Sequence, residues 1–76
     1  MASLRKEFGN RLRGIRMERN LPQERFAELV GISVDFLSLI ERGINAPSFE
    51  TLELIAKRLR MPVKALFDFE ENTRRK

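Results

Sequence analysis

The chain has 76 residues, with 15 Lys and Arg against 11 Asp and Glu, and it contains neither Cys nor His. The absence of these two residue types excludes disulfides, thiolate nucleophiles and histidine general bases, and removes the usual zinc ligands. No apolar run approaches the ~18 residues of a membrane span, and the N-terminal residues lack the apolar stretch of a signal peptide. We therefore expect one small cytoplasmic domain without a membrane partner, a metal or a cofactor.

The positive charge is concentrated near the N-terminus. Residues 5–19 contain the basic side chains Arg5, Lys6, Arg11, Arg13, Arg16 and Arg19, and the acidic side chains Glu7 and Glu18. A local excess of this kind suits a polyanionic partner, but a solvated helix face has the same composition. Only the position of these residues in the fold distinguishes the two interpretations.

The first predicted helix covers about residues 4–19, because apolar residues recur there at spacings of three and four. Its apolar face consists of Leu4, Phe8, Leu12 and Ile15. Asn20 follows the last turn and is expected to adopt the left-handed conformation that ends many helices.

Two shorter helices are predicted next. Residues 23–30 follow Pro22, whose fixed φ suits a helix start, and their inner face consists of Phe26, Ala27 and Val30. Residues 34–42 follow Ser33, a good N-cap, and place Leu37 and Ile40 inward.

The C-terminal part of the domain contains two more predicted helices. Residues 49–59 follow the N-cap Ser48, and their core face consists of Phe49, Leu52, Ile55, Ala56 and Leu59. Pro62 opens a short fifth helix, residues 63–67. Since no segment alternates like a strand, the fold class is all-α. We expect one domain over residues 1–70 and a charged, flexible tail over residues 71–76.

Residues 22–43 carry the most informative pattern, two short helices joined by a three-residue turn. Closely crossing helices need a small residue, which Ala27 supplies, and the turn needs a positive φ, which favours Gly31. Apolar positions in register complete the unit: Ile32 as a plug within the turn, and Leu37 and Ile40 facing back toward the first helix. Gly43 ends it. The pattern predicts a helix-turn-helix, and the alternative is an ordinary helical hairpin within a bundle.

The segments Leu21–Ser33, Phe36–Gly43 and Pro47–Ala56 resemble the Cro/C1-type (XRE) helix-turn-helix family, and the resemblance extends from about Phe8 to Phe67. It implies a compact five-helix bundle of the phage-repressor DNA-binding domain type, with the helix-turn-helix as helices 2 and 3. It further implies a sequence-specific transcriptional regulator, of the stand-alone repressor or restriction–modification controller type, that binds a palindromic operator as a homodimer. Such a protein is bacterial or phage-encoded and associates with the nucleoid when bound.

The resemblance also implies roles for individual residues. Gln23 falls at a phosphate-contacting position, and Arg42 and Asn45 fall where the family approaches phosphate after the recognition helix. The groove-facing positions are Ser33, Val34, Asp35, Ser38 and Leu39. Arg16 and Glu41 match a pair that typically forms an ion pair inside the fold. For a dimer, we expect contacts from the outer face of the fourth helix and from the fifth, namely Leu54, Leu66, Phe67 and Phe69; Phe67 could equally close the monomer core.

Three features depart from the family pattern. Pro22 replaces the usual Thr or Ser cap of helix 2 and cannot cap through its side chain. Arg60 replaces a common Gly after helix 4, and because a left-handed Arg costs roughly 1 kcal/mol, we expect the helix to end differently. Residues 33–39 contain no Arg, Lys, Asn or Gln, the side chains that make most base contacts in the major groove. Asp35 could accept from a cytosine amino group, or simply stabilise the helix N-terminus.

Two functional hypotheses remain from the sequence. The first is a DNA-binding regulator that relies on phosphate contacts and DNA shape more than on base readout. The second is a protein-interaction module of the same fold, such as an antitoxin or anti-regulator, in which Leu29, Leu39 and Leu54 mark a partner surface. An enzyme is not expected, because the catalytic side chains above are absent and the glycines are too far apart for a phosphate-binding loop. No small-molecule substrate is suggested.

Overall fold

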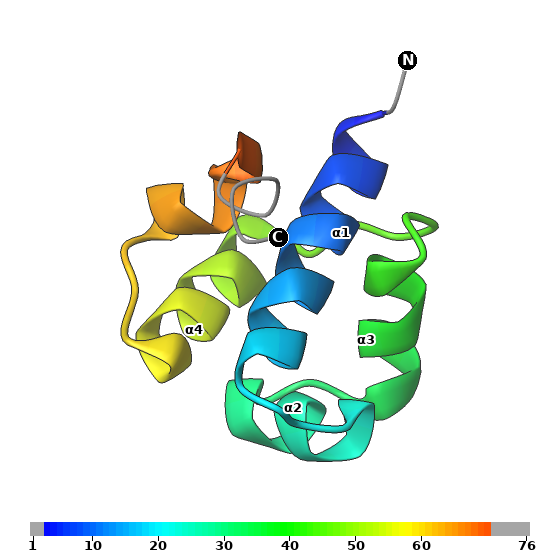
Figure 1. The fold of residues 1–76 in the computed structure, drawn as a ribbon, viewed down its shortest axis with the longest axis vertical. Helices are drawn as coiled ribbons and strands as arrows, with labels where there is room; N and C mark the ends of the chain where they lie inside the picture. The colour runs from blue at the N-terminus through cyan, green and yellow to red at the C-terminus, as the bar shows by residue number, and fades with distance from the viewer. Residues whose placement is uncertain (1–2, 71–76) are drawn as a thin grey trace.

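The computed structural model describes residues 3–70, and within them the chain forms four α-helices and one 3₁₀ helix (Figure 1). The elements are α1 (Leu4–Glu18), α2 (Gln23–Val30), α3 (Val34–Glu41), α4 (Phe49–Leu59) and η1 (Val63–Phe67). The all-α prediction is confirmed over these residues, which include no strand. The predicted tail, residues 71–76, lies outside the described part of the chain.

The predicted fifth α-helix is a 3₁₀ helix instead, so the five-helix description is corrected to four α-helices and η1. In its first turn the Ala65 N–H donates to the Pro62 carbonyl at 2.9 Å, a bond that spans three residues rather than four. Five residues between a proline and the next bend are too few for a stable α-helix, and short helical pieces commonly take this tighter form.

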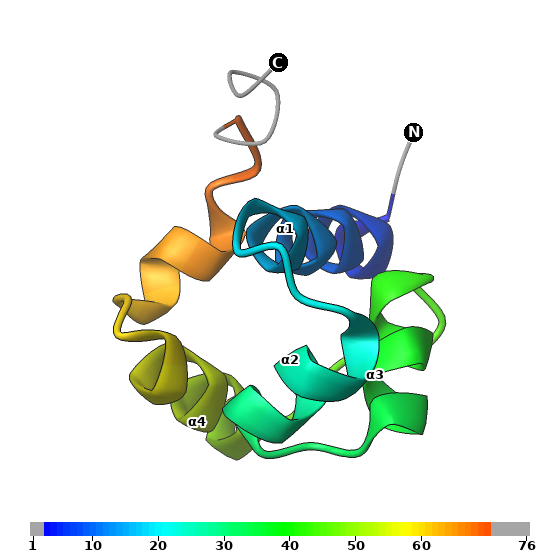
Figure 2. The ribbon, with the colours of Figure 1, turned by 60° about the horizontal axis from the view of Figure 1, so that its bottom comes forward.

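The five elements form a closed ring around one core (Figure 2). Along the ring, α1 contacts α3, α3 contacts α2, α2 contacts α4, α4 contacts η1, and η1 returns to α1. Every element thus buries one apolar face against two neighbours. The core consists of Phe8, Leu12, Ile15, Phe26, Ala27, Val30, Leu37, Ile40, Leu52, Ile55, Ala56, Leu59 and Leu66. No helix in the described range is both long and apolar enough to cross a membrane.

Two residues predicted on apolar helix faces lie outside the core. By their spacing Leu4 shares the apolar face of α1 and Phe49 that of α4, but their side chains are 61% and 83% exposed. Each is the first residue of its helix, directly after the N-caps Ser3 and Ser48. Periodicity identifies which face of a helix is apolar, but it does not tell how far along that face the neighbouring elements reach.

The predicted helix boundaries rest on local hydrogen bonds that the structure contains. The hydroxyl of Ser33 accepts from the Phe36 N–H at 3.0 Å, and that of Ser48 accepts from the Thr51 N–H at 3.1 Å. Ser3 caps α1 in the same way, whereas α2 begins at Pro22 without a side-chain cap, as expected. Left-handed residues end three segments, with φ of 58° at Asn20, 83° at Gly31 and 77° at Gly43.

The end of α4 differs from the prediction. Arg60 does adopt the left-handed conformation, with φ 58°, although it carries a Cβ. The N–H of the next residue, Met61, donates to the Ala56 carbonyl at 3.0 Å, and this bond, typical of a left-handed C-cap, keeps the geometry. The hydrogen bond at the helix end therefore offsets the local strain of the left-handed Arg60.

We expect Arg60→Gly to stabilise the fold by up to about 1 kcal/mol, because glycine adopts this conformation without steric cost. The measurement is the urea midpoint at an unchanged m-value. Arg60→Ala is the matched control, since it removes the same side chain but keeps the Cβ, and it should give no comparable gain. Equal midpoints for the two variants would contradict the assignment of strain to this position.

Candidate nucleic-acid interface

The helix-turn-helix unit is built around a close approach of α2 and α3. Ala27 is buried in the crossing, and its carbonyl accepts from the N–H groups of both Gly31 and Ile32, at 2.9 and 3.0 Å. Gly31 is favoured by its positive φ of 83°, and a Cβ there would also make a tight contact, 3.1 Å, with Leu54 Cδ2 of α4. Leu37 is fully buried. The turn is therefore held by hydrogen bonds to α2 at its start and by the buried Leu37 of α3 at its end.

The outer face of α3 carries the five predicted groove-facing residues. Ser33, Val34 and Asp35 are exposed, and Ser38 and Leu39 are half-buried. The helix turns its other side, with Leu37 and Ile40, into the core. The outer face presents hydroxyls, apolar groups and one carboxylate, and the Ser33 oxygen is already engaged in capping α3.

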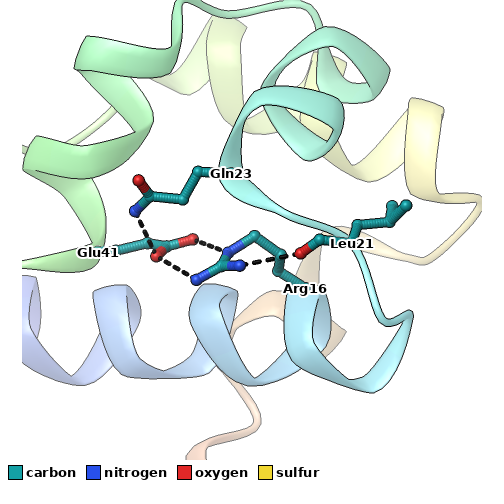
Figure 3. A network of polar contacts seen from close by, with 4 residues as sticks. All are labelled: Arg16, Leu21, Gln23 and Glu41. Carbon is teal, nitrogen blue, oxygen red and sulfur yellow. Dashed lines mark hydrogen bonds and ion pairs between the residues drawn. The ribbon is translucent and has the colours of Figure 1, made fainter.

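A network of polar contacts joins α1, α2 and α3 at the end of α3 (Figure 3). Arg16 Nε donates to Glu41 Oε2 at 2.7 Å, and Arg16 Nη2 donates to Oε1 at 3.1 Å. The pair is largely buried, with side-chain exposures of 13% for Arg16 and 4% for Glu41. A third guanidinium nitrogen donates to the Leu21 carbonyl at 2.9 Å, so Arg16 also holds the segment that leads into α2. The Arg16–Glu41 pair is bidentate, and bidentate arginine–carboxylate pairs are among the strong charge-assisted hydrogen bonds.

Gln23 takes part in the same network. Its Nε2 donates to Glu41 Oε1 at 3.0 Å, and the residue is half-buried. One N–H of the amide is used in this bond and one remains. The first residue of α2 is thereby held beside the end of α3, directly before Arg42.

The two other predicted phosphate contacts follow α3. Arg42 is the C-cap of α3, and Arg42 and Asn45 are both exposed. The Asn45 N–H donates to the Leu39 carbonyl at 3.3 Å, which holds the loop close to the helix it leaves. The side chains of Gln23 and Arg42 thus come from two helices that the network locks together.

Much of the basic charge has a structural role that the sequence did not reveal. Besides Arg16, four arginines donate to backbone carbonyls in loops or near helix ends: Arg5 to Ile44, Arg11 to Ala65, Arg19 to Leu59 and Arg58 to Leu29, at 2.9–3.2 Å. Such bonds satisfy carbonyls that a helix leaves unpaired. The basic segment 5–19 is therefore neither a plain solvated face nor a uniform polyanion site.

The four residues predicted at a dimer interface differ in their positions. Leu66 is fully buried, so its prediction as a contact is wrong: it closes the monomer core beneath η1. Phe67 is half-buried, with its ring 5.2 Å from that of Phe8 and 6.1 Å from that of Phe69. Leu54 is half-buried beside the Gly31 turn.

A different apolar surface is open. Phe49 is 83% exposed and Val63 is 40% exposed. With Leu52, Phe67 and Glu53 they line a hollow of about 370 Å³ between α4 and η1. A second hollow, of about 400 Å³, shares Phe49, Leu52 and Phe67 and continues toward the start of α1. We call the four residues Phe49, Leu52, Val63 and Phe67 the Phe49 face.

Residues 12–66 match the family model described as Helix-turn-helix. The chain belongs to the Cro/C1-type helix-turn-helix family. The control protein C.BamHI of Bacillus amyloliquefaciens is 35% identical over 68 residues, which are 88% of this chain and 84% of that protein. The family assigned from residues 21–56 is therefore confirmed.

Two further relatives agree with this assignment. The cryptic phage CTXphi transcriptional repressor RstR of Vibrio cholerae is 34% identical over 64 residues, 84% of this chain, and the chain spans only 58% of its length. The crystal structure of the restriction-modification controller protein C.AhdI from Aeromonas hydrophila superposes with a TM-score of 0.76 at 32% identity, covering 83% of this chain and 91% of that one. The relatives are named as regulators, in agreement with the prediction that the chain is not an enzyme.

Proposed function

We propose that this chain is a transcriptional regulator that binds operator DNA in the bacterial cytoplasm through α3. The observation that carries the proposal is the helix-turn-helix itself: α3 is fixed by Ala27, Gly31 and the Arg16–Glu41 pair, and its outer face stays uncovered by the rest of the described chain. A helix held rigidly with one free face is what insertion into a major groove requires. The named repressors and controllers among its relatives support this assignment.

Phosphate contacts carry most of the affinity in this proposal. Gln23, Arg42 and Asn45 lie at the start of α2 and after α3, and they position the protein on the duplex. Within the recognition helix, Val34 and Leu39 contact thymine methyl groups, Ser33 and Ser38 exchange hydrogen bonds with base edges, and Asp35 accepts from a cytosine. Such contacts give modest direct readout, so DNA shape contributes to the choice of site.

Selection of bound sequences from a random duplex pool tests the proposal, followed by titration of the selected DNA at increasing salt. We expect enrichment of a palindromic site and a linear fall of log K with log[salt]. No enrichment together with a salt slope near zero would overturn DNA binding. A protein that co-purifies with the chain and stays bound after nuclease treatment would favour the protein-interaction module instead.

We further propose that the chain acts as a homodimer through the Phe49 face. An aromatic side chain that is 83% exposed beside the apolar hollow between α4 and η1 matches what a self-complementary two-fold interface needs, a protruding group next to a recess. A two-fold dimer would set two α3 helices about one DNA turn, ~34 Å, apart.

We expect Phe49→Glu to shift the protein from dimer to monomer without unfolding it. The exposed ring contributes little to the monomer core, whereas a carboxylate in the interface would lose its hydration. Sedimentation at tens of micromolar and thermal melting measure the two effects. Glu50→Gln, an exposed neighbour on the same helix, serves as the control. An unchanged dimer in the Phe49→Glu variant would show that association uses another surface.

A further inference from the structure

We propose that the first turn of α1, together with Arg42 at the end of the helix-turn-helix, forms a further phosphate-binding site for duplex DNA. The site consists of Arg5, Lys6 and Arg42, which we call the basic corner. This inference rests on the proposed function. It extends the DNA interface to two residues outside the range 12–66 that the family model matches.

The basic corner exists because α1 packs on the loop that follows α3. Arg5 Nη1 donates to the Ile44 carbonyl at 3.0 Å, a contact between residues 39 positions apart. A Cβ at Gly43 would lie 3.0 Å from Lys6 Cα, so the stem of Lys6 crosses the bare backbone of that glycine. Gly43 is thus needed for close approach as well as for its positive φ. The first turn of α1 and the end of α3 become one surface.

The charges on this surface are available. Arg5, Lys6 and Arg42 are all exposed, and Arg5 spends one of its five N–H donors on Ile44. Glu41, the nearest acidic residue along the chain from Arg42, is neutralised by Arg16. Glu7 is the other acidic residue of these segments, so three cations face one carboxylate. By contrast, Arg11 is buried, and Arg11 and Arg19 are committed to carbonyls near η1 and α4.

The arrangement fits a phosphodiester backbone better than a single small anion. The cations come from two segments and lie on an exposed surface, whereas a free anion is normally held by converging donors in a recess. Arg42 directly follows the recognition helix, so a duplex whose major groove holds α3 passes its backbone over this corner. Because the recognition helix lacks basic side chains, additional phosphate contacts would supply the affinity that base contacts do not.

The test is the salt dependence of binding to a mixed-sequence duplex of about 30 base pairs, long enough for two half-sites one turn apart. We compare the full chain with its Lys6→Gln and Arg5→Gln/Lys6→Gln variants. The matched control is Lys57→Gln, an exposed lysine on α4, which Figures 1 and 2 place on the opposite side of the ring from α3. Thermal melting of each variant shows whether the fold is intact.

We expect Lys6→Gln to reduce the magnitude of the log K against log[salt] slope by about 0.9 for each bound protomer, hence by about 1.8 for a dimer on two half-sites, and the double variant by about twice that. The loss should be equal on mixed-sequence and selected DNA, because phosphate contacts carry no sequence information. Lys57→Gln should keep the slope of the unaltered chain. A slope that Lys6→Gln leaves unchanged, while the unaltered chain binds with a salt-dependent affinity, overturns the basic corner alone. Failure of the unaltered chain to bind overturns the proposed function and the corner together.

Discussion

Replacing Gly9 by alanine is expected to destabilise this domain by at least about 3 kcal/mol, at the upper end of overpacking effects. Gly9 lies in the middle of α1, where that helix crosses α3. A Cβ there would overlap the carbonyl oxygen of Ile40 and lie 2.9 Å from that of Glu41. Both obstacles are backbone atoms, so α1 and α3 would have to separate. A domain of this size is stable by roughly 4–11 kcal/mol in total, so a large share would be lost.

Helix propensity predicts the opposite sign, which makes the experiment decisive. In an isolated helix, glycine to alanine gains about 1 kcal/mol. Gly14→Ala, in the same helix, is the matched control, and there the propensity gain should dominate. Melting temperatures measure both, and a loss of about 3 kcal/mol corresponds to roughly 12–24 °C for a chain of this length. If Gly9→Ala melts at or above the temperature of the unaltered chain, the close crossing of α1 and α3 is not as described.

Glu41→Ala is expected to have the second largest effect, a loss of about 3 kcal/mol. The substitution leaves the Arg16 guanidinium largely buried without its anion, and removing one partner of a buried pair costs far more than removing an exposed one. It also removes the acceptor of the Gln23 amide. Because this carboxylate links α1, α2 and α3, the orientation of α3 relative to α2 should loosen, and DNA affinity should fall along with stability.

A double-mutant cycle separates the pair from the sites around it. The double variant Arg16→Met/Glu41→Leu removes both charges. Its loss of unfolding free energy should be smaller than the sum of the losses in the single variants Arg16→Met and Glu41→Leu. Glu28→Ala, an exposed carboxylate of α2, is the control and should change the unfolding free energy by less than about 0.5 kcal/mol. Additive effects of the two single variants would mean that Arg16 and Glu41 do not act as a pair.

The helices and their ends were largely predictable because they depend on local interactions. The spacing of apolar residues, the hydroxyls of Ser33 and Ser48, and glycine at positions 31 and 43 act within a few residues along the chain, and the structure confirms them. One prediction at a helix end was wrong, and the interaction that decided the outcome is again local. Arg60 is left-handed despite its Cβ because the Met61 N–H reaches back to Ala56.

Residues whose roles depend on distant segments were harder to predict. Phe49 has the spacing of a core residue but lies at the exposed start of α4. Leu66 was expected at a dimer interface but is fully buried in the core. For the arginines of α1, charge was visible in the sequence and the acceptors were not, since the carbonyls of Leu59 and Ala65 lie 40 and 54 positions away. Of the candidate DNA contacts, the family resemblance supplied Gln23 and Arg42, whereas Arg5 and Lys6 emerged from the packing of α1 on Gly43.

By itself the sequence determined an all-helical domain, its helix-turn-helix at residues 22–43 and its family, because periodicity, capping residues and turn glycines act over short distances along the chain. Only the tertiary structure decided what the individual charged and small residues do. It placed Gly9 and Gly43 where two backbones meet, turned four more arginines toward backbone carbonyls, and left Phe49 uncovered. The physical reason is that these roles depend on contacts between residues far apart along the chain, and such contacts exist only once the chain has folded.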